Sequence, residues 1–304
     1  MPGPEGPWEE VQERFERTGR AVVHATWGQW LTPALLDPAL RTLLGRDWPR
    51  FRRHPAPAGR LVLAVSRILL KHTAAAVLQV PAGRLDLAAL PGGRPVLRGL
   101  GADLQVSLAH TDELIVVGVS RAGVVGVDAE PTARRISFDA LREHVCTAAE
   151  ARRLAALPEA ERTQAFLRLW TLKEAYAKAL GHGMRRRFPA IGFEWDEAIT
   201  ARLTGDTARE WVFATHLVDE RYLVSQAYHS GQAHPRQAAP PQPDGPPQPD
   251  GPSRPDRSPQ PEGSSRPEVP CPPPVGGVPT GPSLVQPYGG RVLGFPGQGG
   301  PGPR

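Results

Sequence analysis

The chain has 304 residues, with 36 Lys and Arg against 31 Asp and Glu, and only two cysteines. This length allows two ordinary domains, the cysteines cannot form a disulfide framework, and no apolar run is long enough to span a membrane. The first residues lack the basic and apolar segments of a secretory signal, so we expect a cytoplasmic protein. The net charge of +5 favours anionic partners such as nucleotides or acidic proteins.

The first third of the chain is predicted to be largely helical. Residues 1–20 form a leader with a short charged helix, residues 31–44 form one or two more, and residues 59–80 form a long apolar helix. Basic residues in the long helix, including Arg60 and Lys71, are either its solvated face or contacts to a bound anion. The residues alone leave both interpretations open.

A turn and a strand are predicted next. The turn covers residues 91–95 and holds Arg94, and the alternating segment 104–111 follows as a strand that contains Ser107 and ends near His110. A single histidine at a strand end is usually structural or simply exposed. The sequence therefore marks His110 only as a candidate.

Two short apolar segments, 114–120 and 124–127, predict a β-hairpin that runs into an acidic tip. In this tip Asp128 and Glu130 stand two residues apart, so on an extended chain both carboxylates point to the same side. Two adjacent carboxylates suit Mg²⁺, which prefers oxygen ligands. A solvated acidic turn is the alternative interpretation.

A second long helix is predicted from residue 163 to residue 180. Good helix formers continue without Gly or Pro, and Gly181 follows where a left-handed C-cap residue is expected. Glu174 and Lys178 stand four residues apart, so they lie on one side of this helix. They are either an exposed ion pair of little worth or part of the site that the acidic tip begins.

The remaining elements of the second half are shorter. Thr147 to Glu150 is a capping box, which explains Glu150 without a catalytic role. Residues 191–195, 211–218 and 222–228 alternate as strands do. Basic side chains gather in two loops, of which the second either is solvated or faces an anion: Arg134 with Arg135, and residues 185–187.

The composition changes abruptly in the last quarter. Of 36 prolines, 22 fall after Ser230, and the hexapeptide 240–245 is repeated at residues 246–251. Such a segment cannot bury enough apolar area to offset its ordering entropy, so residues 230–304 are predicted to be a disordered Pro/Gly-rich tail. The tail is either a linker or extension without further role, or a Pro-rich ligand for a partner domain.

Two of these segments together resemble a known family. Residues 126–130 read Gly-Val-Asp-Ala-Glu, residues 170–178 read Trp-Thr-Leu-Lys-Glu-Ala-Tyr-Ala-Lys, and 46 positions separate Asp128 from Glu174. In this order and spacing, the pair resembles the signature of the 4'-phosphopantetheinyl transferase superfamily. The resemblance covers residues 50–228, a length similar to the two-lobed, monomeric Sfp type.

The resemblance implies a fold and a domain organisation. We expect an α+β protein in which two similar α/β lobes form a pseudo-dimer. Residues 21–122 would be the N-terminal lobe, and residues 123–229 would be the C-terminal lobe with the metal and catalytic motifs. The leader 1–20 and the tail 230–304 would lie outside both lobes.

The resemblance also implies roles for individual residues. Asp128, Glu130 and Glu174 would hold Mg²⁺, for which Mn²⁺ can substitute, and Glu174, Lys178 and Asp128 would be catalytic. Trp170 is most simply a core anchor of its helix. Contacts to the co-substrate coenzyme A would come from six residues: His110, Arg94, Lys173, Arg60, Lys71 and Ser107. Alanine at position 109 stands where the family has a second serine, so a hydroxyl contact is lost there.

The implied activity is transfer of the 4'-phosphopantetheine arm of coenzyme A to a serine of an apo acyl, peptidyl or aryl carrier protein, as in holo-acyl-carrier-protein synthases. The second product would be 3',5'-adenosine bisphosphate. Neither nucleic acid nor a membrane is expected as a partner. Two alternatives stay open: a catalytically silent module that binds coenzyme A or a carrier protein, and a Mg²⁺-dependent hydrolase of nucleotide pyrophosphates.

Overall fold

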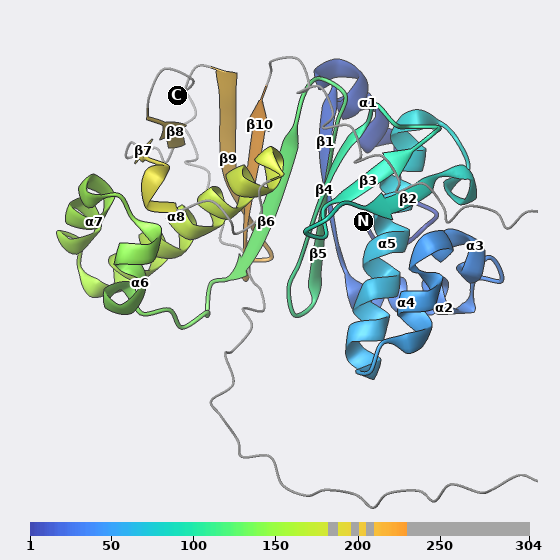
Figure 1. The fold of residues 1–304 in the computed structure, drawn as a ribbon, viewed down its shortest axis with the longest axis horizontal. Coiled ribbons are helices and arrows are strands. Elements are labelled where there is room, and N and C mark those ends of the chain that lie inside the picture. Colours follow the sequence, from blue (N-terminus) through green and yellow to red (C-terminus); the bar gives the residue numbers. More distant parts are fainter. Residues whose placement is uncertain (182–187, 196–200, 205–209, 230–304) are drawn as a thin grey trace, which may run out of the picture. The chain divides into compact units, whose positions relative to one another are not determined.

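The computed structural model of the protein describes residues 1–181, 188–195, 201–204 and 210–229, which all belong to one compact unit (Figure 1). The predicted tail and the basic segment 185–187 lie outside the described residues.

Two three-stranded antiparallel sheets and two long helices form the frame. Helix α5 (Pro57–Leu78) packs on the first sheet, and helix α8 (Glu159–Leu180) packs on the second (Figure 1). The α+β fold class is therefore confirmed. The first sheet has the order β1 (Arg20–Thr26), β5 (Leu114–Ser120), β4 (Gln105–His110), and the second has the order β6 (Val125–Pro131), β10 (Tyr222–His229), β9 (Trp211–Val218).

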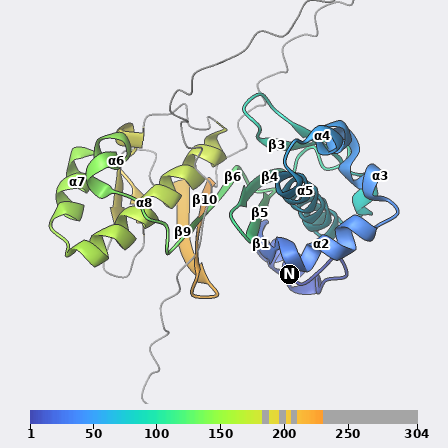
Figure 2. The same cartoon turned by 90° about the horizontal axis from the view of Figure 1, so that it is seen from below.

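Shorter elements surround this frame (Figure 2). The helices before β2 gather around α5, whereas α6 and α7 lie beside α8. The elements are α1 (Glu9–Thr18), α2 (Trp27–Leu36), α3 (Leu40–Leu44), η1 (Gly45–Asp47), α4 (Trp48–Arg53), η2 (Ala82–Arg84), β2 (Asp86–Ala89), β3 (Pro95–Arg98), α6 (Phe138–Val145), α7 (Ala148–Ala155), η4 (Phe188–Ala190), β7 (Phe193–Trp195) and β8 (Ala201–Leu203).

Helix α5 is the core helix of the first half. Within the described ranges, it alone is long and apolar enough to cross a membrane by length and composition, yet 67% of its apolar window is buried in the protein. It ends at Gln79, which adopts the left-handed conformation with φ 54°. The apolar pattern that predicted this helix thus reflects burial on all sides.

The second long helix, α8, begins at Glu159, one turn before the predicted start. Pro158 precedes it in an extended conformation, and Glu159 and Glu161 in the first turn interact favourably with the helix dipole. The helix ends as predicted at Leu180, with Gly181 in the left-handed conformation at φ 73°. Residues 159–162 are therefore the first turn of this helix.

The predicted β-hairpin between residues 114 and 127 is wrong. Strands β5 and β6 are consecutive, but β5 pairs with β1 and β4, whereas β6 pairs with β10. Strand β1, which the sequence analysis did not predict, occupies the free edge of β5 that a hairpin would need. Its signal was the alternation of buried Ala21, Val23 and Ala25.

The predicted acidic tip is also wrong, because Asp128 and Glu130 lie within strand β6. Their backbone partners on β10 are Ser225 and Leu223. A carboxylate held in a paired strand has a fixed direction. This position therefore gives both side chains a defined orientation that a mobile turn would not give.

The two sheets are joined by packing and by one side-chain hydrogen bond. An apolar cluster takes residues from β4 and β5 of the first sheet and from β6 and β10 of the second, including Val116, Val127 and Val224. The backbone N–H of Val127 donates to the hydroxyl oxygen of Ser107 at 3.0 Å. A side chain thereby satisfies a β6 donor that no strand partner reaches.

Strand β6 lies directly against helix α8. A Cβ atom at Gly126 would stand 1.9 Å from the carbonyl oxygen of Ala175 and 2.5 Å from the amide nitrogen of Ala179. Only glycine permits the backbones of β6 and α8 to come this close. Beside this contact, the buried hydroxyl oxygens of Thr171 on α8 and Ser225 on β10 are 2.7 Å apart.

We predict that Gly126→Ala lowers the free energy of unfolding by about 3 kcal/mol, because the added methyl must push α8 away from β6. Urea unfolding followed by circular dichroism measures this loss. Gly28→Ala is the matched control, since Gly28 lies in helix α2 with nothing near its Cβ position. An equal loss for both variants would contradict the close contact.

Candidate active site

Carboxylates from strand β6 meet helix α8 at the backbone contact described above. Alternation along the strand places Asp128 and Glu130 on the face that carries Gly126, which is the face toward α8. From α8, Lys178 reaches this face and Glu174 lies one turn before it. The two predicted motifs therefore come together in one site.

Two ion pairs hold the site in its present form. The Nζ atom of Lys178 lies 2.6 Å from Oδ1 of Asp128. The guanidinium of Arg134 donates to Oε1 of Glu130. The carboxylates of Asp128 and Glu130 are almost completely buried, whereas Lys178 is partly open to solvent.

The remaining oxygens of the two strand carboxylates lack a partner. Oδ2 of Asp128 and Oε2 of Glu130 are buried and accept no hydrogen bond. An unpaired buried acceptor is costly, so a ligand that supplies positive charge or a donor is favoured here.

Burial and the neighbouring charges shift the pKa values of the three carboxyl groups and of the lysine. Burial and the neighbouring charge of Asp128 raise the pKa of Glu130 to about 7. The same two causes raise the pKa of Glu174 to about 7. Burial also raises the pKa of Asp128, against the effect of Lys178. Burial acts to lower the pKa of Lys178, but the three carboxylates raise it above the ordinary lysine value.

These donors fit a divalent cation. An all-oxygen set with two orphaned buried acceptors is what Mg²⁺ or Mn²⁺ takes. As placed, the described parts of the chain hold no group of three or more His, Cys, Asp or Glu side chains close enough to bind an ion. Lys178 and Arg134 occupy one oxygen of each strand carboxylate instead. Metal binding therefore requires side chains to rearrange.

Two predicted contacts of coenzyme A lie near this site. His110 is open to solvent at the end of β4, and partial desolvation with the positive charges of Lys178 and Arg67 lowers its pKa. Arg94 reaches the C-terminal end of α8, since its guanidinium lies next to Gly181, three residues after Lys178. Both residues come from the first half of the chain. The structure thus brings basic groups of the first half to α8 of the second.

Lys173 lies elsewhere, and the prediction that it reaches a coenzyme A phosphate is wrong. Its side chain is fully buried, with Nζ 2.6 Å from Oε2 of Glu150 and within hydrogen-bond distance of the carbonyls of Val145 and Phe188. These three acceptors use all three ammonium hydrogens. Lys173 instead ties α8 to Val145 at the end of α6, to Glu150 of α7 and to Phe188 of η4.

Glu150 is the partner of Lys173 as well as a helix cap. Its Oε2 accepts from the backbone N–H of Thr147, which completes the predicted capping box, and its Oε1 accepts from that of Phe193. The cap was predicted correctly. The buried ion pair was missed, because Glu150 and Lys173 are 23 residues apart and no local pattern connects them.

The predicted coenzyme A contacts of Lys71 and Ser107 do not fit their positions either. Lys71 is buried and donates to the carbonyl of Leu43. Ser107 is buried between the sheets, where its hydroxyl accepts from Val127. Arg60 donates to the carbonyl of His54, while its Nε is buried without a partner and so keeps a free donor.

Arg134 is a site residue that the sequence analysis did not place. Besides pairing with Glu130, its guanidinium lies 5.3 Å from the ring centre of Trp170 on α8. Trp170 also packs edge-on against Phe188, as expected of a core anchor. The spacing of Arg134 four residues after Glu130 was the only sequence signal, and a loop gives such spacing no fixed meaning.

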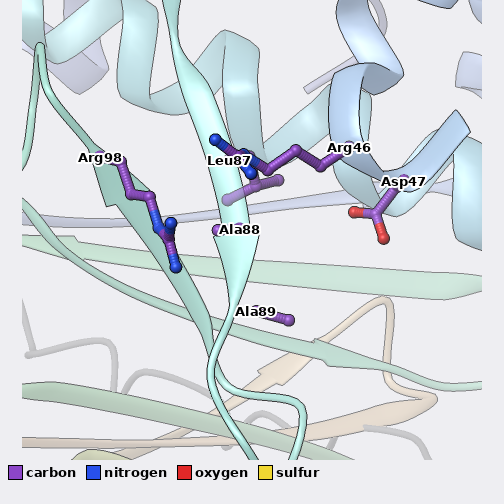
Figure 3. Close-up of a pocket in the computed structure, with 6 residues that line it drawn as sticks. All are labelled: Arg46, Asp47, Leu87, Ala88, Ala89 and Arg98. Carbon is purple, nitrogen blue, oxygen red and sulfur yellow. The ribbon is translucent and has the colours of Figure 1, made fainter. Parts of the chain in front are cut away.

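A cavity of about 280 Å³ lies apart from the carboxylates, beside the β2–β3 hairpin (Figure 3). Arg98 supplies positive charge to its lining, whereas Arg46 is paired with Asp86 and Asp47 with Arg67, each at 2.8 Å. The lining residues are Arg46, Asp47, Leu87, Ala88, Ala89 and Arg98.

The fold and the site define an α+β protein whose carboxylates and lysine meet at a strand–helix contact. Residues 124–227 match the family model of the 4'-phosphopantetheinyl transferase superfamily, and this region contains β6 and α8 complete. The chain is therefore similar to that superfamily over the region that holds the two motifs.

Curated relatives show the same similarity. The chain is 27% identical over 153 residues to the 4'-phosphopantetheinyl transferase HetI of Nostoc sp., covering 50% of this chain and 65% of the relative. It is 35% identical over 156 residues to the L-aminoadipate-semialdehyde dehydrogenase-phosphopantetheinyl transferase of Eremothecium gossypii, covering 50% and 55%. It is 44% identical over 61 residues to pptA of Paxillus involutus, covering 20% and 22%. In each case the chain spans less than two thirds of the relative's length.

We predict that the metal-free protein loses stability as the pH rises from about 5 to about 8. Glu130 and Glu174 have pKa values of about 7 in the folded protein against an ordinary 4.5. Folding therefore favours their protonated forms, and this contribution is lost as the pH passes through the folded pKa. Mg²⁺ is expected to restore more stability at the higher pH, since it binds the ionised carboxylates.

Urea unfolding in a chelator and in Mg²⁺ measures these free energies. The double variant Glu130→Gln with Glu174→Gln is the control, and its stability is expected to change less with pH. A metal-free wild type whose stability stays level or rises across this range would contradict the prediction.

We also predict that Lys173→Met lowers the free energy of unfolding by about 3–5 kcal/mol, because the carboxylate of Glu150 is left buried without its counter-ion. Adding Glu150→Gln is expected to recover part of this loss. Arg152→Met, an exposed change on α7, serves as the control. Independent, additive losses in the double variant would show that the pair is not coupled.

Proposed function

We propose that the protein transfers the 4'-phosphopantetheine arm of coenzyme A to a serine of an apo carrier protein and releases 3',5'-adenosine bisphosphate. The observation that carries this proposal is the meeting of Asp128, Glu130, Glu174 and Lys178 where β6 contacts α8. The superfamily match covers these four residues, and the relatives described above are named as phosphopantetheinyl transferases.

The proposed chemistry divides the work among these residues. Asp128, Glu130 and Glu174 would hold Mg²⁺, or Mn²⁺ in its place, which when bound withdraws negative charge from the pyrophosphate. Glu174, with a raised pKa near the operating pH, is the candidate proton acceptor for the carrier serine. Lys178 is held as a cation by its neighbours and would offset charge on the leaving phosphate.

Coenzyme A would lie along the basic groups of the first half. His110 and Arg94, which both lie near the C-terminal half of α8, are the favoured contacts. Arg60 is a further candidate through its guanidinium, although its Nε is buried. The two sheet-and-helix halves support the Sfp type, a pseudo-dimer of lobes within one chain. We propose a cytoplasmic monomer, since such a chain forms its site without a second copy.

The basic balance suits an acidic carrier. Arg135 is exposed beside the site and is a candidate contact for it. Fatty-acid, polyketide and non-ribosomal-peptide carriers share this chemistry, so the carrier is proposed as a class. A silent binding module needs no catalytic groups, and the presence of all three carboxylates together with Lys178 favours the transferase over it.

The test is the intact mass of an apo carrier protein after incubation with this protein, coenzyme A and Mg²⁺. We expect a gain of one phosphopantetheine arm, lost in Asp128→Ala and in Glu174→Ala because each removes a carboxylate of the site. Arg152→Ala, remote and exposed, is the control and is expected to keep full activity.

The alternatives give different results in the same experiment. Consumption of coenzyme A without any carrier, and without mass gain, would identify a hydrolase. Binding of coenzyme A with no reaction on acyl, peptidyl or aryl carriers would leave a silent module. Either result overturns the transferase proposal.

A further inference from the structure

Arg134 places a guanidinium on a carboxylate that the proposed function assigns to the metal. It pairs with Oε1 of Glu130, with only 18% of its own side chain and 7% of that of Glu130 exposed. An ion pair this sheltered from water is screened little by salt. A cation arriving at Glu130 must therefore compete with Arg134.

Trp170 gives the guanidinium of Arg134 a second interaction partner. The ring centre lies 5.3 Å from the guanidinium carbon, within the range of a cation–π contact. The indole is fixed on α8 by its packing against Phe188. Arg134 can thus leave the carboxylate and remain against the aromatic face.

The two cations differ in the segments that carry them, since Arg134 follows a turn in which its backbone N–H donates to the carbonyl oxygen of Pro131, whereas Lys178 lies inside a long helix. Residues 134–137 form neither helix nor strand between β6 and α6. Lys178 belongs to the rigid helix α8, and three carboxylates hold its charge. Of the two cations paired with the strand carboxylates, Arg134 is the one that a divalent cation can replace.

The charge of the site indicates the same exchange. Asp128, Glu130 and Glu174 together can carry three negative charges, and Lys178 and Arg134 supply two positive ones. Addition of a divalent cation with both basic groups in place would leave excess positive charge. Release of Glu130 by Arg134 also frees the oxygen that the metal needs, beside the unpartnered Oε2.

We propose that Arg134 is a displaceable counter-ion, which neutralises Glu130 in the metal-free protein and is exchanged for the divalent cation. The inference rests on the proposed function, since it takes Glu130 to be a metal ligand. Arg134 then sets the metal affinity and prevents the carboxylates from repelling one another when no metal is bound. It is a positioning residue and need not touch the substrate.

The test measures the affinity for Mn²⁺ alone by titration calorimetry, without coenzyme A or carrier. Arg134→Gln is expected to bind Mn²⁺ about tenfold more tightly than the wild type, because the competing ion pair is gone. The same variant is expected to be less stable than the wild type in a chelator. Arg135→Gln removes the same charge from an exposed neighbour, and its affinity is expected to stay within about twofold of the wild type.

A second readout follows the guanidinium itself. Mn²⁺ quenches fluorescence, so Mg²⁺ is used for this arm, and the change in tryptophan fluorescence on binding is expected to disappear in Trp170→Phe.

Arg134→Lys keeps the charge but loses the planar fork. It is expected to bind Mn²⁺ more tightly than the wild type and decides the matter if Arg134→Gln does not fold.

The outcomes separate the inference from the proposed function. Wild-type binding of Mn²⁺ with equal or weaker binding by the Arg134 variants would overturn the inference and leave the metal site intact. Equal gains in Arg134→Gln and Arg135→Gln would also overturn it, since they would reflect net charge alone. Absence of Mn²⁺ binding in every variant would overturn both the inference and the metal site.

Discussion

The backbone contact between strand β6 and helix α8 determines where every proposed catalytic group lies. At Gly126 the strand approaches the helix so closely that no side chain fits between them. The next residues on that face of the strand are carboxylates, and the next turns of the helix carry Lys178 and Glu174. A site made from two regular elements in backbone contact is held more rigidly than one made from loops.

The buried polar groups around this contact have two different purposes. The hydrogen-bonding groups of Lys173 and Glu150 are satisfied, so this pair fixes the position of α8 relative to α7. Asp128 and Glu130 are only half satisfied, and their free oxygens lie next to a glutamate with a raised pKa. Complete satisfaction is typical of structural groups, whereas incomplete satisfaction indicates a place for a ligand.

The first half of the chain contributes to the site from the other side. His110 at the end of β4 and Arg94 after β2 lie near α8 of the second half, and the hydrogen bond from Val127 to Ser107 holds the sheets together between them. One oxygen of each strand carboxylate pairs with Lys178 or Arg134. The proposed exchange of Arg134 for a divalent cation would complete the site.

The sequence by itself determined the long helices and the two motifs, because each depends on local spacing, and the resemblance that the motifs carry implied the α+β class. An apolar helical run, a glycine C-cap and carboxylates two residues apart are properties of neighbours along the chain. Only the tertiary structure decided which strands pair, since β1 took the edge of β5 that a hairpin would have used. It also decided that Lys173 is a buried anchor while Lys178 faces the site. These two lysines have the same side chain and lie on the same helix, and what separates them is the direction of each on a helix whose two faces pack against different partners.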